Sequence, residues 1–95
     1  MDFWFNGNEY HLARYRMESE KRRKEFEKHL GYSLDDYQFE VCINKKIDDT
    51  IFSFDRITII GIYKDVYDLL DNCIIENRTF RDILLSDDIE VTGKD

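Results

Sequence analysis

Two histidines and the cationic residues near the first of them are the side chains of this sequence best suited to acid–base chemistry. An imidazole pair could exchange protons at a phosphate held by arginine, as in a ribonuclease. The residues concerned are His11, Arg14, Tyr15, Arg16 and His29. The histidines are eighteen residues apart, no third residue visibly orients either one, and a net charge of −7 repels a polyanionic substrate. We therefore interpret the protein as a non-enzyme.

Metal chemistry has no ligand pattern in this sequence. A zinc site needs three or four ligands at short spacing, whereas His11, His29, Cys42 and Cys73 form no paired motif. No stretch has the alternating acidic residues, the glycine and the final glutamate of a calcium-binding loop. The two cysteines lie in separate apolar stretches, which predicts two buried thiols. We expect no metal and no cofactor.

A basic run at residues 21–24 is the first candidate binding feature. Glutamates surround it, and Glu20 with Lys24 lies at the i to i+4 offset, where an ion pair stabilises a helix by roughly 0.2–0.5 kcal/mol. The pattern indicates a solvated helix. The alternative is nucleic-acid or phosphate binding through a basic helix over residues 14–28. Its candidate residues are Arg14, Arg16, Arg22 and Arg23.

An acidic face on the strongest helical pattern, residues 65–76, is the second candidate. The apolar stripe of this pattern consists of Val66, Leu69, Leu70, Cys73 and Ile74. The opposite face carries Asp65, Asp68, Asp71, Asn72 and Glu76, with Ile75 in its middle. An apolar side chain ringed by carboxylates is typical of a surface that binds a basic protein. We therefore predict that these six residues bind a partner.

A small α+β fold must position these residues. At 95 residues and 11.6 kDa the chain supports one domain, and 42% hydrophobic residues indicate a packed core. We expect an N-terminal hairpin and a charged surface helix over 1–31. An antiparallel β-meander at about 37–63, packed against one or two C-terminal helices, follows within 32–86. Residues 87–95 form a tail or an edge strand.

The N-terminal hairpin is predicted by Asn6-Gly7, a pair that tolerates the positive φ of a tight turn. A helix from Asn8 to Leu30 is the competing interpretation, so residues 8–15 are strand or helix. Residues 16–30 are helical in both interpretations. Gly31 suits the left-handed end of that helix.

The central segment predicts three strands, at 37–44, 50–55 and 56–63. Gly61, inside the last of them, predicts relief of crowding or a bulge. Thr79 with Asp82 predicts a short capped helix over 80–85, for which a strand is the alternative. Ile89 and Val91 predict an edge strand in the tail, and a tail without regular structure is the alternative.

The charge distribution leads to the functional hypothesis. Residues 1–30 carry a net charge of +1 and residues 31–95 a net charge of −8. Such an acidic surface favours a basic protein partner, for example a nuclease, and disfavours direct binding of nucleic acid. We expect a non-enzymatic protein that binds and inhibits a basic nucleic-acid-handling protein, as a nucleic-acid mimic, an anti-defence protein or an immunity protein.

Composition adds an expected origin and location. Phe, Tyr, Met, Ile, Asn and Lys total thirty-eight residues, against twelve for Gly, Ala, Arg and Pro, which indicates an AT-rich genome of a bacterium or phage. Since no apolar run is long enough to span a membrane, we expect a cytoplasmic protein with no membrane partner. A phage assembly protein is a further alternative. It would form homo-oligomers through an exposed N-terminal edge with Phe3, Trp4 and Phe5.

Overall fold

The first two strands form the predicted hairpin around Asn6-Gly7. Strand β1 spans Asp2–Phe5 and β2 spans Asn8–Arg14. Asn6 has a φ of 53° and Gly7 a φ of 81°, the two positive values that a type I′ turn requires. The competing helix from Asn8 is wrong, because β2 pairs with β1 on one side and with a later strand on the other.

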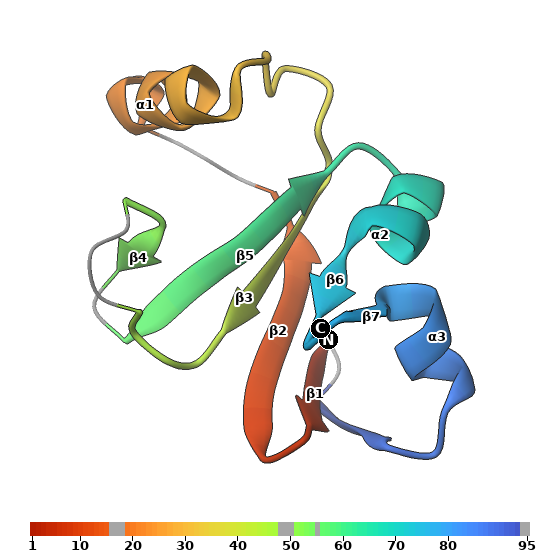
Figure 1. Cartoon of the computed structure of the whole chain (residues 1–95). Coiled ribbons are helices and arrows are strands. Elements are labelled where there is room, and N and C mark those ends of the chain that lie inside the picture. The colour runs from red at the N-terminus through yellow and green to blue at the C-terminus, as the bar shows by residue number, and fades with distance from the viewer. Residues whose placement is uncertain (16–18, 48–50, 55, 94–95) are drawn as a thin grey trace.

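The charged helix α1 spans Glu20–Leu30 (Figure 1). The structure, a computed structural model, describes residues 1–15, 19–47, 51–54 and 56–93, so the predicted first residues of this helix, 16–18, lie outside it. Ser19 caps the helix, because its side-chain oxygen accepts a hydrogen bond from the Arg22 backbone N–H at 3.3 Å. Gly31 ends it at a φ of 84°, as predicted.

Six strands form one antiparallel sheet in the order β4-β5-β3-β2-β1-β8. The α+β class is thereby confirmed, but the meander order is wrong. The longest apolar strand, β5, pairs directly with β3, and the two-residue β4 lies at the outer edge. A strand of two residues leaves few unpaired backbone N–H and C=O groups on its outer side, and such short strands are typical of sheet edges. The strands span Phe39–Ile43 (β3), Ser53–Phe54 (β4), Ile57–Tyr63 (β5) and Ile89–Gly93 (β8).

The C-terminal third alternates short helices with a small hairpin. Its elements are α2 (Val66–Asn72), β6 (Ile74–Ile75), β7 (Arg78–Thr79) and α3 (Phe80–Leu85). The predicted cap of α3 is confirmed, since the Thr79 side-chain oxygen accepts a hydrogen bond from the Asp82 N–H at 3.1 Å. The strand alternative for 80–85 is therefore wrong. The tail forms the predicted edge strand, because β8 pairs with β1.

Strand alternation separates two hydrophobic clusters on the two faces of the sheet. We call one side the α2–α3 face and the other the α1 face, after the helices packed there (Figure 1). On β3, Val41 belongs to the first cluster and the adjacent Cys42 to the second. The α2–α3 face buries Phe3, Phe5, Tyr10, Val41, Ile43, Tyr63, Leu69, Cys73, Ile75, Phe80 and Ile83. The α1 face buries Phe26, Leu34, Cys42, Ile59 and Ile62.

Strand β1 is internal to the sheet, with β2 and β8 as its neighbours. Phe3 and Phe5 are buried, whereas Trp4 between them is 41% exposed. The predicted N-terminal edge with three exposed aromatic side chains is therefore wrong, because β8 covers that edge and alternation turns two of the three rings into the core.

Gly61 sits where β5 departs from regular pairing. Val41 pairs with Gly61 and Cys42 with Ile59, so β5 holds one extra residue and forms the predicted bulge. The Tyr63 ring lies across Gly61, and a β-carbon at position 61 would overlap its phenol group. Since Tyr63 is itself buried, its ring has little room to move away. Gly61 therefore leaves the space that the ring fills.

We predict that Gly61→Ala destabilises the protein by about 1–3 kcal/mol, the usual range for overpacking a core. Urea unfolding of both proteins measures the difference. The same substitution in a Tyr63→Ala background should cost little, because the overlapping ring is absent. An equal loss in both backgrounds would contradict this explanation of Gly61.

Candidate functional site

The predicted acidic residues lie on α2 and on the turn after β6. Asp65 is the N-cap of α2, and its side-chain oxygen accepts a hydrogen bond from the Asp68 N–H at 2.8 Å. Asp68, Asp71 and Asn72 follow within the helix, and Glu76 lies in the turn of the β6–β7 hairpin. The first carboxylate thus caps the helix, and its negative charge interacts favourably with the positive end of the helix dipole.

Asp68 is hydrogen-bonded through both carboxylate oxygens. Its Oδ2 accepts a bond from the Lys64 backbone N–H at 2.8 Å, and its Oδ1 accepts one from the Asn72 side-chain amide at 2.6 Å. A substitution of Asp68 would therefore disturb α2 as well as remove a charge. Variants that test the surface must leave this residue in place.

Ion pairs tie the acidic residues of α2 and α3 to two arginines. Arg81 on α3 contacts Asp71 on α2 at 2.8 Å. Arg78 on β7 contacts Asp82 at 2.9 Å and Asp88 at 3.2 Å. Exposed pairs of this kind contribute only about 0–1 kcal/mol each to stability, so their main effect here is to set the spacing of charges across the two helices.

Ile75 does not lie on the acidic surface, and its prediction as the apolar anchor is wrong. The predicted helix over 65–76 ends at Asn72, and the chain turns back through Glu76 and Asn77, which have φ values of 51° and 68°. The resulting hairpin directs Ile75 into the core, where it is 2% exposed. Ile74, expected on the buried stripe, is instead 50% exposed, as is Val66 at 51%.

Tyr67 and Leu85, and not Ile75, are exposed apolar side chains on the helices that carry the acidic residues. They are 74% and 83% exposed, the most exposed large apolar side chains of the two helices. Tyr67 lies one helical turn before Asp71, and Leu85 lies one turn after Arg81. Because Asp71 and Arg81 are in contact, the four residues form a continuous row across α2 and α3. We call this row the α2–α3 surface.

The charge around the α2–α3 surface is strongly negative. Residues 65–90 contain eight acidic residues and two basic ones, and both of those, Arg78 and Arg81, are already paired with aspartates. Within the residues that the structure describes, Asp65, Asp68, Glu76 and Asp87 form no ion pair. Their carboxylates give the surface a net negative potential.

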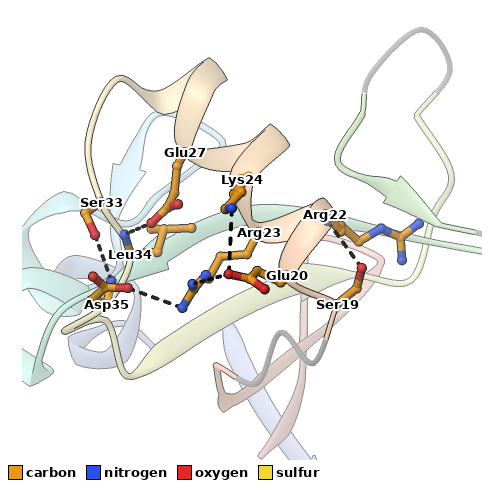
Figure 2. Close-up of polar contacts among 9 residues, drawn as sticks. All are labelled: Ser19, Glu20, Arg22, Arg23, Lys24, Glu27, Ser33, Leu34 and Asp35. Atoms are coloured by element: carbon orange, nitrogen blue, oxygen red, sulfur yellow. Dashed lines mark hydrogen bonds and ion pairs between the residues drawn. The ribbon is translucent and has the colours of Figure 1, made fainter.

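Two basic residues of α1, Arg23 and Lys24, form ion pairs within the protein (Figure 2). Arg23 contacts Asp35 at 3.2 Å and Glu20 at 4.0 Å, and the predicted Glu20–Lys24 pair is present at 3.7 Å. Glu27 accepts a hydrogen bond from the Leu34 backbone N–H at 2.7 Å. The Arg23 and Glu27 contacts attach α1 to the segment that follows it.

The four candidate phosphate-binding arginines are spread over separate parts of the chain. Arg14 is exposed at the end of β2, Arg22 and Arg23 lie on α1, and Arg16 is outside the described residues. Arg14 therefore lies on the sheet, whereas two of the others lie on the helix. The Arg23 guanidinium group donates a hydrogen bond to the Asp35 carboxylate (Figure 2).

The two histidines have different neighbours. His11 on β2 bonds the Asp2 carboxylate across the β1–β2 pair. His29, at the end of α1, lies against the Phe52 ring with centroids 6.5 Å apart. His11 thus lies in the sheet, whereas His29 belongs to the surroundings of the second hydrophobic cluster.

Nucleophilic chemistry at sulfur is disfavoured by burial. Cys42 and Cys73 are free and buried, as predicted. Burial raises the pKa of the Cys42 thiol to about 12 and also raises the pKa of Cys73. Since the thiolate is the reactive form, both groups are poor nucleophiles near neutral pH.

Clusters of metal ligands and internal cavities are the other features that could hold a small ligand. Among the described residues, no group of three or more His, Cys, Asp or Glu side chains is arranged to hold a metal ion. An apolar pocket between α1 and the sheet has a volume of about 80 Å³ and is lined by Leu30, Phe52, Ile59, Ile60, Gly61 and Ile62. Small-molecule sites are usually about 300–1,000 Å³, so this pocket is better explained as a packing gap.

The described part of the chain contains no helix of the length and apolarity needed to cross a membrane. No protein-family model matches the sequence, and neither the curated proteins nor the solved structures include a significant match.

Glu40 is a half-buried carboxyl group on β3, near His11. Burial raises its pKa above the ordinary value of 4.5, and the nearby His11 opposes this effect. The folded state therefore holds the Glu40 proton more tightly than the unfolded state does. As a result, ionisation of Glu40 removes stability while the pH rises from about 4.5 through the raised pKa.

We predict that Glu40→Gln is more stable than the native protein at pH 7, and that this advantage shrinks as the pH falls through the raised pKa and is lost below about 4.5. Thermal unfolding at a series of pH values measures the difference. Glu25→Gln, at an exposed position of α1, is the matched variant. An advantage for Glu40→Gln that stays constant over the whole pH range would contradict the prediction.

Proposed function

We propose that this protein is a small non-enzymatic interaction protein, of bacterial or phage origin, that binds and inhibits a basic nucleic-acid-handling protein. The observation that carries the proposal is the α2–α3 surface, where two exposed apolar side chains flank an ion pair within a strongly acidic segment. The two free thiols suit the reducing cytoplasm, where we expect it to act.

The apolar side chains supply the contact area that charge alone cannot. Interfaces typically contain a few aromatic or aliphatic anchors within a polar rim. Tyr67 and Leu85 are exposed in the free protein and would each lose water on binding. The surrounding carboxylates would steer a basic partner and reject acidic ones.

The spacing of the carboxylates favours a partner that handles nucleic acid. Asp65, Asp68 and Asp71 follow one another at i, i+3 positions, where neighbouring side chains are roughly 5–6 Å apart. This separation is near that of successive phosphates along a strand. A groove built for phosphates would therefore accept the row, and occupying that groove would inhibit its owner.

The alternative, phosphate binding by α1, has less support. Arg23 is paired with Asp35 and Glu20, and Lys24 is paired with Glu20. Binding a phosphate there would require these pairs to break. By contrast, Asp65, Asp68, Glu76 and Asp87 form no ion pair within the described structure.

We predict that affinity capture with this chain as bait recovers a basic protein that salt releases. Tyr67→Ala with Leu85→Ala should weaken the complex at least about tenfold, as is usual for interface anchors. Asp71→Asn with Glu76→Gln should weaken it through lost charge, while leaving the Asp68 hydrogen bonds in place. Titration of the purified partner measures each affinity.

The matched control is Lys21→Ala with Arg22→Ala, two exposed positions of α1. It should leave the affinity unchanged. A neutral or acidic partner, or a partner lost with the α1 pair and retained with both α2–α3 pairs, would overturn the proposal.

A further inference from the structure

Trp4 lies on the α1 face of the sheet between two glutamates. Alternation along β1 turns Phe3 and Phe5 into the first cluster, so Trp4 points to the opposite side. In the sheet register Trp4 is directly opposite Glu9 of β2 and Glu90 of β8. Side chains at directly opposed positions share a face, with β-carbons about 4.5–5.5 Å apart. The indole is therefore flanked by a carboxylate on each side.

The side chains around Trp4 add further carboxylates and hydrogen bonds on the same face of the sheet. The Asn44 side-chain amide donates to the Glu9 carboxylate, which fixes that carboxylate at the β2 side of the indole. One row along, the Asp2 carboxylate bonds His11. Of the described β1 and β2 residues on this face, none is lysine or arginine. This part of the sheet is acidic and carries one large aromatic ring.

The helices leave this part of the sheet open. Helices α2 and α3 pack on the other face, and α1 packs on Cys42, Ile59 and Ile62 of β3 and β5. Trp4 is 41% exposed, and within the described chain it makes no ring-stacking or cation–π contact. An exposed indole between carboxylates is the arrangement that binds an organic cation, because the ring face and the carboxylates both attract positive charge.

We propose that this surface, formed by Trp4, Glu9 and Glu90, binds an arginine-rich segment of a partner protein. A guanidinium group stacks on the indole through its flat face and donates hydrogen bonds at its edge, where the two carboxylates lie. Lysine offers only a point charge and fits the arrangement less well. The site is on the opposite side of the sheet from the α2–α3 surface, so it does not depend on the function proposed above.

The experiment uses the fact that Trp4 is the one tryptophan in the sequence. Tryptophan fluorescence of the full chain is followed during titration with an oligoarginine peptide at fixed ionic strength. We expect a saturable change in emission, about tenfold weaker binding of oligolysine of equal length, and none of an oligoglutamate. Glu9→Gln with Glu90→Gln should weaken oligoarginine binding about tenfold.

Two further variants make the result decisive. Trp4→Leu, measured by calorimetry because the reporter is lost, should also weaken binding. Glu25→Gln with Asp36→Asn removes the same number of charges at two exposed positions outside both proposed surfaces and should leave binding unchanged. Equal weakening by both charge pairs would show diffuse attraction by net charge and would overturn the site. Peptide binding with no change in Trp4 emission would overturn it as well.

Discussion

The contact among Phe3, Tyr10 and Phe80 holds the fold together. Phe3 on β1 stacks on Tyr10 of β2 with ring centroids 5.3 Å apart, and Phe80 at the start of α3 lies 5.6 Å from Phe3. Phe3 is fully buried and Tyr10 and Phe80 nearly so, and the Phe80 N–H also bonds the Cys73 carbonyl oxygen at 2.9 Å. One aromatic group thus connects the N-terminal hairpin, the end of α2 and the start of α3. Buried rings of this size dominate the apolar surface removed from water.

The positions of both candidate surfaces follow from this contact. Anchoring Phe80 places Arg81 beside Asp71 and leaves Leu85 on the outer side of α3. Burying Phe3 on one face of β1 requires Trp4 to lie on the other. The same core residues therefore present an acidic helical surface on one side of the sheet and an indole between glutamates on the other. The basic helix α1 belongs to neither surface, and contacts of Arg23 and Glu27 hold it to the segment that follows.

Local signals in the sequence predicted local structure well. Asn6-Gly7, Gly31 and Thr79 specify backbone geometry or hydrogen bonds over a few residues, so the hairpin and both helix ends were found. The order of β3, β4 and β5 depends on pairing between distant segments, which such signals do not encode. The prediction of one helix over 65–76 was wrong because the same spacing of apolar residues also fits a shorter helix followed by a hairpin. As a result, Ile75 was predicted to be the exposed apolar residue of the surface, whereas in the structure Ile75 is buried and Tyr67 is exposed.

We propose that a basic partner occupies the α2–α3 surface. Amide hydrogen exchange of the chain, measured alone and in the purified complex with its captured partner, tests it most directly because it locates the interface without any substitution. We predict that binding slows exchange within residues 66–85 and leaves α1 (Glu20–Leu30) unchanged. Slower exchange in α1 with none in residues 66–85 would contradict the claim.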